Sequence, residues 1–291
     1  MLLAQARPSW LKKRIENQEN VSSLRQFLRQ EGIATVCESA RCPNIWHCYG
    51  EKTPSFMILG TICTRRCNFC SVSSGVPQAL DEAEPQKIAK AVLELGLDYI
   101  VITSVTRDDL RDKGAGLFTT TISQVKNVSP RTKIEVLVPD FGARKGLVRL
   151  VAVSPCDVFA HNVETVKRLY PNIRPQANYG RSLNVLKTAA ESGAITKSAL
   201  MLGLGETKPE VLDTMLDLKG VNVKILTLGQ YLKPDASKFE VAEYLKPDLF
   251  EEYRSIAEGM GFLAVASGPF VRSSYRAKEL YKEVMRGESL W

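Results

Sequence analysis

The residues of this chain best suited to chemistry are cysteines near its beginning. Six of the seven cysteines lie between positions 37 and 70, in two sets of three. The second set, Cys63, Cys67 and Cys70, occupies one short segment with gaps of three and two residues. A 4Fe–4S cluster normally takes four cysteine ligands, so three leave one iron open to bind another molecule. This spacing predicts an iron–sulfur cluster with an open coordination position.

The first set, Cys37, Cys42 and Cys48, has gaps of four and five residues. A disulfide framework is disfavoured because the chain is large, is 44% hydrophobic and begins without the apolar stretch of a secretory signal. Zinc favours four ligands in closely spaced cysteine pairs, often with histidine, and neither set offers that pattern. The seventh cysteine, Cys156, is interpreted as a small buried apolar residue.

Alternating strands and helices must position these cysteines. From residue 54 onward, short apolar runs alternate with amphipathic stretches, which predicts a parallel sheet with crossover helices. We expect strands at 55–60, 98–103, 133–138, 157–160, 197–202 and 224–228. We expect helices at 85–95, 117–128, 146–153, 182–192, 209–218 and 247–260. Six such repeats favour an α/β fold, a partial TIM-like (β/α)6 barrel, with a doubly wound open sheet as the alternative.

The chain is accordingly divided into three parts. Residues 1–53 form an N-terminal extension that carries the first cysteine set. Residues 54–268 form the partial barrel, and residues 269–291 form a C-terminal segment with a helix at 275–285. The second cysteine set follows the first predicted strand, and other polar segments follow the later strands. In a parallel barrel these segments meet at one face, where we expect the chemistry to occur.

The charge pattern narrows the choice of partners. The net charge is +7, and its positive residues are scattered, without the aromatic-interleaved basic stripe of single-strand binders. We therefore expect no nucleic acid and interpret the charge as favouring solubility through a diffuse positive field, with attraction to an acidic partner as the alternative. No window approaches the roughly 18 apolar residues of a membrane span, so we expect no membrane and a cytoplasmic location. A zinc-stabilised nucleic-acid-binding protein stays open as an alternative function.

The spacing of Cys63, Cys67 and Cys70 after a first barrel strand resembles the signature of the radical S-adenosylmethionine superfamily. The resemblance implies that the open iron binds the amino and carboxylate groups of S-adenosylmethionine. An electron from the reduced cluster would then release a 5′-deoxyadenosyl radical. Phe69, between two of the cysteines, is expected to shield one side of the cluster, with ordinary packing as the alternative.

Further segments resemble the lipoyl synthase family, in the expected order from about residue 33 to 280. They are 37–48, 103–110, 161–165, 203–207, 229–232 and 272–275. The resemblance implies an auxiliary 4Fe–4S cluster on Cys37, Cys42 and Cys48, which donates sulfur and is consumed. Two sulfur atoms would enter at C6 and C8 of an octanoyl chain amide-linked to a lysine. An alternative is another enzyme of the superfamily whose auxiliary cluster only transfers electrons.

The resemblance also implies partners for this reaction. The octanoyl chain would be carried by a lipoyl carrier domain or an H protein. An electron donor such as ferredoxin or flavodoxin would reduce the clusters, and an iron–sulfur cluster carrier would restore the consumed one.

The fourth ligand of the auxiliary cluster is, in that family, a serine of the Arg-Ser-Ser-Tyr motif. We assign Ser274 to this role, with Ser273 as the alternative and a helix N-cap as the purely structural interpretation. A serine alkoxide is a harder ligand than a thiolate, so iron should release it more easily. That suits a cluster that must give up its sulfur.

Loops after the other strands are expected to bind S-adenosylmethionine. We assign the methionyl end to Thr103, Ser104, Arg107 and Asp108, with a capped, salt-bridged turn as the alternative. We assign the ribose hydroxyls to Asn162 and Glu164, with an exposed polar turn as the alternative.

Other charged residues and departures bear on the partner. Arg174 and Lys233 are interpreted as surface charges, with contact to an acidic carrier as the alternative. The chain departs from the family pattern at Lys113, at Ala160 and around Lys238. These departures remove no cluster ligand, but they put the substrate or carrier preference in doubt.

Overall fold

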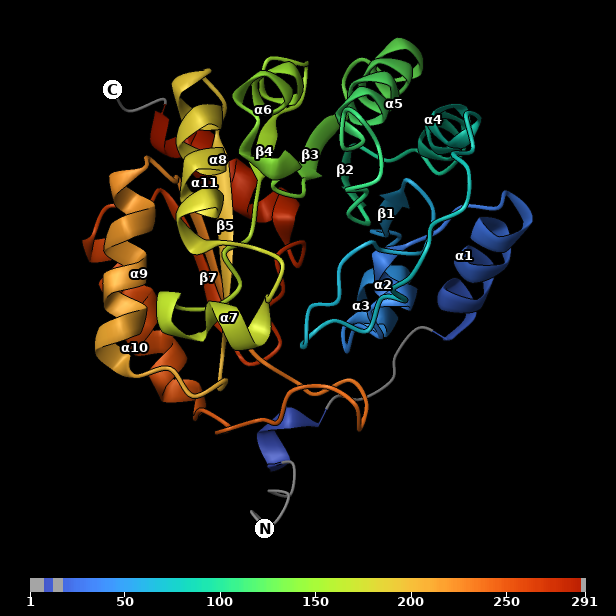
Figure 1. Cartoon of the computed structure of the whole chain (residues 1–291). Helices are drawn as coiled ribbons and strands as arrows, with labels where there is room; N and C mark the ends of the chain where they lie inside the picture. The colour runs from blue at the N-terminus through green and yellow to red at the C-terminus, as the bar shows by residue number, and fades with distance from the viewer. Residues whose placement is uncertain (1–7, 13–17, 289–291) are drawn as a thin grey trace.

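A seven-stranded parallel sheet, with strands in chain order β1 to β7, organises the molecule (Figure 1). The computed structural model describes residues 8–12 and 18–288. The strands are β1 Ser55–Ile58, β2 Tyr99–Ser104, β3 Lys133–Leu137, β4 Val158–Ala160, β5 Thr196–Leu202, β6 Ile225–Gln230 and β7 Ala264–Gly268. Because β1 and β7 do not pair with each other, the sheet is a partial barrel, as predicted.

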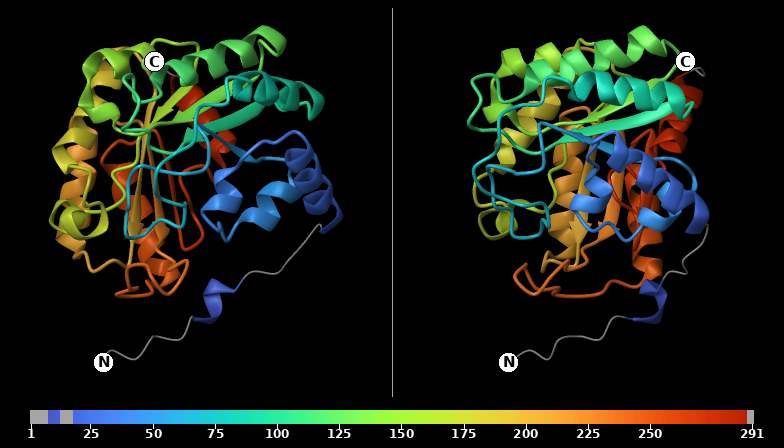
Figure 2. Two further views of the ribbon diagram at one scale, coloured as in Figure 1. Left: turned by 45° about the vertical axis from the view of Figure 1, so that its right-hand side comes forward. Right: turned by 90° about the vertical axis from the view of Figure 1, so that its right-hand side faces the viewer.

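Helices cover the outside of the sheet (Figures 1 and 2). They are α1 Gln18–Gln30, α2 Val36–Ser39, α3 Ile45–Gly50, α4 Glu84–Glu94, α5 Ala115–Val128, α6 Lys145–Ala152, α7 Tyr170–Ile173, α8 Tyr179–Glu191, α9 Lys208–Gly220, α10 Pro247–Gly259 and α11 Ala277–Glu288. Short 3-10 turns lie at Ser9–Leu11, Phe141–Ala143 and Lys167–Leu169. The six predicted crossover helices and the C-terminal helix are all present.

The predicted strands are confirmed, and one strand was missed. Each of the six predicted runs forms a strand, and β7 adds a seventh. The β7 sequence, Ala-Val-Ala-Ser-Gly, has one β-branched residue, so its composition gave no strand signal. The helices α1, α2, α3 and α7 were also not predicted. The domain limits at 53/54 and 268/269 stay a proposal.

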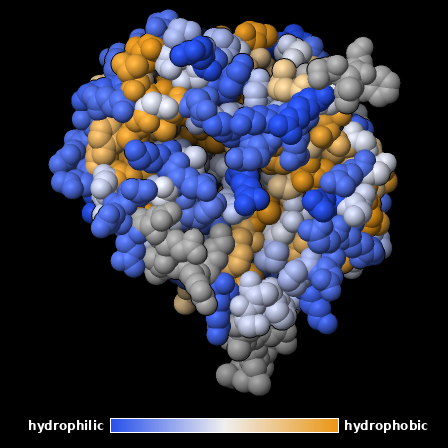
Figure 3. Space-filling model, turned by 180° about the vertical axis from the view of Figure 1, so that it is seen from behind, coloured by the Kyte–Doolittle hydropathy of each residue, from blue (hydrophilic) through white to orange (hydrophobic). Residues whose placement is uncertain are grey.

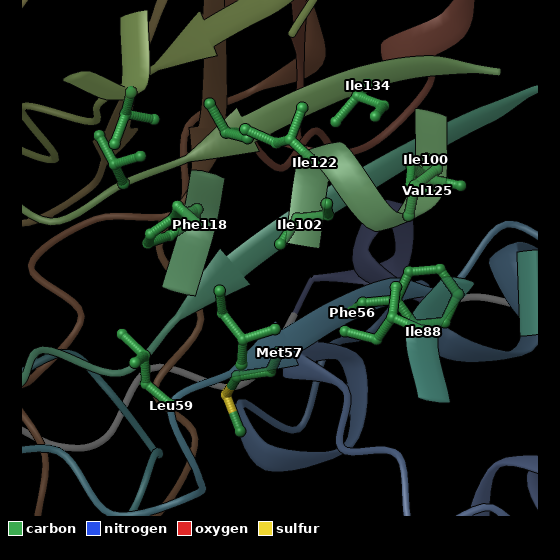
Figure 4. Close-up of a cluster of buried hydrophobic side chains, with 14 of the residues drawn as sticks. Phe56, Met57, Leu59, Ile88, Ile100, Ile102, Phe118, Ile122, Val125 and Ile134 are labelled. Atoms are coloured by element: carbon green, nitrogen blue, oxygen red, sulfur yellow. The ribbon is translucent and has the colours of Figure 1, made fainter. Parts of the chain in front are cut away.

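Each central strand separates two cores. Ile100 and Ile102 of β2 face outward and pack with Ile88 of α4 and with Phe118 and Ile122 of α5 (Figure 4). The alternate residues face inward, because successive side chains of a strand point to opposite faces. Continuous burial along β2 and β6 follows from this two-sided packing, as expected for a parallel sheet.

The helix α11 closes the barrel at the amino ends of its strands. Leu280 and Val284 of this helix form one cluster with Tyr99 and Ile225, which begin β2 and β6. The loops that follow the strands lie at the opposite end. The fold therefore leaves that loop-bearing end as the place where the predicted chemical groups meet.

The inner layer also contains a buried ion pair. Lys197 Nζ of β5 donates to both carboxylate oxygens of Glu135 of β3, at 2.8 and 3.0 Å, and both side chains are 0% exposed. The Tyr99 hydroxyl of β2 donates to the same carboxylate at 2.9 Å. Burial and the adjacent carboxylate raise the pKa of Tyr99, which keeps it a donor. This cluster ties three strands together inside the barrel.

Hydrophilic residues cover most of the face turned away in Figure 1, with smaller hydrophobic patches among them (Figure 3). In the part of the chain that the structure describes, none of the helices combines the length and apolarity that crossing a membrane requires.

Replacing one partner of the buried ion pair is expected to destabilise the fold. Lys197→Met leaves a buried carboxylate without its cation, which should lower the free energy of unfolding by about 3–5 kcal/mol. The double variant with Glu135→Leu should recover part of that loss. Urea unfolding of the two variants measures both values. A single variant as stable as the unsubstituted chain would contradict the pairing.

Candidate cluster and cofactor site

The loop after β1 carries Cys63, Cys67 and Cys70, and hydrogen bonds to other loops fix its path. The backbone N–H of Thr64 donates to the carbonyl of Thr106 after β2, at 3.0 Å. Asn68 donates its backbone N–H to Ile173 of α7 at 2.9 Å and accepts from the N–H of Phe239 after β6 at 2.8 Å. The predicted meeting of the loops at one face is therefore confirmed.

Arg65 holds three of these loops together. Its Nε and Nη2 donate to the two carboxylate oxygens of Asp108, after β2, at 2.6 and 3.0 Å. Its Nη1 and Nη2 donate to the two carboxylate oxygens of Asp140, after β3, at 2.8 and 2.7 Å. Arg65 is 7% exposed and Asp140 is 0% exposed, so this pairing is shielded from water. Despite its burial, Asp140 has a lowered pKa because Arg65 stabilises its charged form.

The second cysteine set has the environment of metal-binding thiolates. Cys63 Sγ accepts the backbone N–H groups of Arg65 and Thr106 at 3.4 and 3.3 Å. Burial and the neighbouring Cys67 and Cys63 raise the pKa of Cys70 to about 12, while a hydrogen bond from the Val72 backbone opposes them. Three thiols close enough to oppose one another's ionisation need a shared cation to stay ionised. This donor set fits an iron–sulfur cluster.

The first cysteine set lies beside β1, in and between α2 and α3. Burial, followed by the nearby Cys42, raises the pKa of Cys37 to about 11. Cys48 and Ser274 line the same cavity, of about 300 Å³, although they are far apart in sequence. The side-chain amide of Asn44 donates to the carbonyl of Phe270 at 2.6 Å, so the cysteine segment and the C-terminal segment touch directly.

The cysteines of the described residues are thiols and are not joined in disulfides. All seven cysteines lie in the described part of the chain, and none forms a disulfide there. Within residues 8–12 and 18–288, no three His, Cys, Asp or Glu side chains converge on one metal-ion position. A cubane needs no such convergence, because each cysteine binds a different iron.

Of the four residues predicted to bind the methionyl end of S-adenosylmethionine, three form hydrogen bonds or ion pairs within the chain. Thr103 donates its hydroxyl to the Leu137 carbonyl at 2.9 Å, and Asp108 is paired with Arg65. Arg107 pairs with Asp109 at 2.8 Å and donates to the Leu59 carbonyl. These are the contacts of the salt-bridged turn that we weighed as the alternative.

Ser104, the fourth of these residues, differs from the other three. Its hydroxyl is buried and has no hydrogen-bond partner in the described ranges. A buried hydroxyl without a partner costs free energy, so it favours the arrival of an external polar group. The cofactor roles of Thr103, Ser104, Arg107 and Asp108 stay predictions.

Asn162 and Glu164 form a connected pair after β4. The Asn162 amide donates to a carboxylate oxygen of Glu164 at 3.1 Å. Burial raises the pKa of Glu164, and the charges of Arg174 and Arg272 oppose that rise. Both residues are half-buried, so the exposed polar turn weighed as the alternative does not describe them. Contact with the ribose stays a prediction.

Comparison with known proteins identifies the family. The model of the radical SAM superfamily matches residues 57–218. A lipoyl synthase of Caldicellulosiruptor saccharolyticus is 49% identical over 279 residues, covering 95% of this chain and 98% of that protein. A lipoyl synthase of Pyrobaculum calidifontis is 50% identical over 283 residues, covering 96% and 97%. This chain belongs to the lipoyl synthase family.

Membership of the lipoyl synthase family, within the radical SAM superfamily, implies binding of a 4Fe–4S cluster and S-adenosylmethionine.

Solved structures have the same fold as this chain. The HydG maturase of the [FeFe]-hydrogenase matches with a TM-score of 0.58 and 12% identity, over 78% of this chain and 54% of that one. Methylornithine synthase (PylB) matches with a TM-score of 0.55 and 14% identity, over 86% and 76%. At such low identity these similarities show the fold alone.

Two arginines of this lipoyl synthase family member were not recognised as site residues from sequence. Arg65 was not singled out, although a cation between two cysteines, with aspartates after two strands, was a readable signal. Arg174 was interpreted as a surface charge, which is wrong. Its Nη1 donates to the carbonyls of Asn162 and Val163 at 2.8 and 3.3 Å, and its charge acts on Cys67.

Other motifs shared with lipoyl synthases have structural explanations. A Cβ at Gly203, where φ is +93°, would lie 2.3 Å from the Glu243 carbonyl oxygen, so this turn requires glycine. Phe69 packs partly buried against the core between the sheet and α9 and α10, so shielding of the cluster stays a prediction. His161 is a buried histidine whose ring nitrogens contact the Val138 carbonyl and the Ser182 hydroxyl at 2.8 and 3.0 Å.

The departures from the lipoyl synthase pattern lie close to the site. Lys113 adopts a φ of 55° and donates through Nζ to the Asp108 carbonyl. Ala160 is buried at the end of β4. Lys238 adjoins Phe239, whose backbone contacts the cysteine loop. Changes in these segments therefore reach the loop without changing its ligands.

Replacing Arg65 is expected to loosen the cysteine loop. Arg65→Gln removes the nearer cation from the buried Asp140 carboxylate, which keeps Arg181 Nη1 at 3.3 Å, and should lower the free energy of unfolding by about 3 kcal/mol. Arg65→Lys should recover only part of this, because an ammonium cannot donate to both carboxylates in a planar fork. Urea unfolding and iron content after anaerobic reconstitution measure the effect. Full stability and full iron retention in Arg65→Gln would exclude this role.

Protonation of His161 is expected to destabilise the fold below neutral pH. Burial, followed by the charge of Arg174, lowers the pKa of His161 from 6.5 to about 4. Between these values the unfolded chain binds a proton that the folded chain excludes, so stability falls as pH falls, by about 1.4 kcal/mol per unit. His161→Gln should show a shallower loss in urea unfolding between pH 6.5 and 4. Equal slopes for both proteins would refute the assignment.

Proposed function

We propose that this chain is a lipoyl synthase, which inserts two sulfur atoms at C6 and C8 of a protein-bound octanoyl-lysine. The match to lipoyl synthases over nearly the whole chain carries the proposal. The presence of both cysteine sets and of the Arg-Ser-Ser-Tyr segment supports it. The proposed sulfur donor is the auxiliary cluster, which is consumed as a substrate.

Cys63, Cys67 and Cys70 would hold the cluster that cleaves S-adenosylmethionine. When bound, that cluster supplies the electron that breaks the sulfonium C–S bond and yields a 5′-deoxyadenosyl radical. The chain's part is to hold the ligands still. Backbone N–H groups donate to Cys63, and Arg65 fixes the loop against its neighbours.

Cys37, Cys42, Cys48 and Ser274 would hold the auxiliary cluster. Ser273 is the weaker candidate, because its hydroxyl lies 2.9 Å from Asn162 Oδ1 and donates to it. Ser274 instead lines a cavity together with Cys48. An oxygen ligand that iron releases readily suits a cluster that gives up sulfur.

Two arginines interact with charges of both cysteine sets and with Glu164. Arg272 is close enough to Cys42 and Glu164 to interact with both charges. Arg174 interacts in the same way with Glu164 and Cys67. The two sets thus flank one group of side chains, which supports two clusters acting on one substrate between them.

S-adenosylmethionine would bind between these sets. The proposed contacts of its methionyl end are Thr103, Ser104, Arg107 and Asp108, among which the Ser104 hydroxyl lacks any partner in the described chain. Asn162 and Glu164 would contact the ribose. Phe69 would shield the cluster from one side.

The proposed macromolecular partner is an octanoylated lipoyl carrier domain or H protein, whose acidic surface would complement the net charge of +7. An electron donor such as ferredoxin or flavodoxin would supply the electrons. An iron–sulfur cluster carrier would restore the auxiliary cluster.

The activity can be tested with an octanoylated carrier peptide, S-adenosylmethionine and a reductant. Mass spectrometry should detect addition of two sulfur atoms, with about one auxiliary cluster consumed per product. An auxiliary cluster that survives several products would instead support the electron-transfer alternative.

Substitution of each cysteine set should separate their roles. Cys63→Ala should abolish S-adenosylmethionine cleavage, because the cluster that binds the cofactor loses a ligand. Cys42→Ala should retain cleavage and lose sulfur addition. Chromatography of 5′-deoxyadenosine and mass spectrometry of the peptide measure the two steps. Identical behaviour of both variants would contradict this division.

A further inference from the structure

The segment 270–274, here called the strap, contacts the segment that carries the first cysteine set and the loop after β4. At its first residue, the Phe270 carbonyl accepts the Asn44 side-chain amide at 2.6 Å, between Cys42 and Cys48. Near its end, Ser273 Oγ donates to Asn162 Oδ1 at 2.9 Å, across 111 residues of sequence. The strap is thus a short physical link between the two regions.

The strap has little freedom to move as a whole. A Cβ at Gly229 of β6 would lie 2.0 Å from the Val271 carbonyl oxygen, so the strap rests directly on the strand. Its ends are turns, closed by Val271 N–H to the Gly268 carbonyl and by Tyr275 N–H to the Arg272 carbonyl, both at 3.0 Å. Motion at one strap residue must therefore be shared by its neighbours.

Ser273 orients the pair that faces the proposed cofactor. Because Asn162 Oδ1 accepts from Ser273, the Asn162 amide nitrogen points to Glu164, at 3.1 Å. The backbone carbonyl of Asn162 is held by Arg174 at 2.8 Å, so the remaining freedom is in the side chain. Loss of the Ser273 contact would let that side chain rotate.

Arg272 gives the strap a second connection. It lies within electrostatic range of Cys42 on one side and Glu164 on the other. The hydroxyl of Ser273 and the cation of Arg272 act on the same Asn162–Glu164 pair.

We propose that the strap couples the state of the auxiliary site to the affinity for S-adenosylmethionine. This rests on the proposed function, in which Ser274 ligates the auxiliary cluster. Release of Ser274 would shift the adjacent Ser273 and misorient Asn162, so the cofactor site would differ before and after sulfur is withdrawn. By linkage, bound S-adenosylmethionine would favour the ligated position of Ser274 by the same factor.

The test measures binding of S-adenosylmethionine, by anaerobic equilibrium dialysis without reductant. The reconstituted chain is compared with Cys37→Ala, which disrupts the auxiliary site without touching the strap. We expect about a three- to tenfold weaker affinity in Cys37→Ala, the size of one net hydrogen bond. Adding Ser273→Ala to each protein should remove the difference, and Ser273→Thr, which keeps the hydroxyl, should preserve it.

Ser267→Ala is the matched control, since this serine of β7 donates instead to the Phe250 carbonyl at 2.7 Å. The control should keep the difference between the two proteins. Equal affinities of the reconstituted chain and Cys37→Ala for S-adenosylmethionine would overturn the coupling. So would a difference in affinity that persists after Ser273→Ala is added to both proteins. Failure of every protein to bind S-adenosylmethionine would overturn the proposed function, and the coupling with it.

Discussion

The interaction on which the site depends is the pairing of one buried guanidinium with two carboxylates. Arg65 lies between the first two cysteines of its loop, and its partners Asp108 and Asp140 follow different strands. A loop with three metal ligands has no regular secondary structure to fix it, so its order must come from such contacts. The planar fork of arginine meets both carboxylates at once, which sets the orientation of the loop as well as its position.

Much of the fold could be predicted because buried parallel strands are continuously apolar, as in Tyr99–Ser104. Sequence patterns did not predict the elements whose structure depends on packing and not on composition. The strand β7 consists mostly of small residues, and α2 and α3 are short helices between cysteines. Cysteine spacing indicated the family directly, since the residues of its motif lie close together in sequence. The roles of Arg65 and Arg174 depend on partners that are distant in sequence and that only the fold brings near. The sequence alone therefore did not reveal these roles.

The two cysteine regions are held in place by different parts of the chain. One lies on a barrel loop, whereas the other lies in an extension and is met by the far end of the chain. Assembly of the region around the first cysteine set thus needs the completed sheet, because the strap crosses β6 before Ser274 reaches the cavity that Cys48 also lines. The barrel interior, with its Glu135–Lys197 pair and the covering helix α11, supplies the rigid frame for both.

The close approach of the Val271 backbone to Gly229 has an evolutionary consequence. Even alanine, whose side chain is a single methyl group, would displace the backbone at Val271. No substitution of Gly229 is therefore possible without a shift of that backbone. A descendant with alanine at this position must have moved the backbone at Val271 away from β6, and the segment that leads to Ser274 with it.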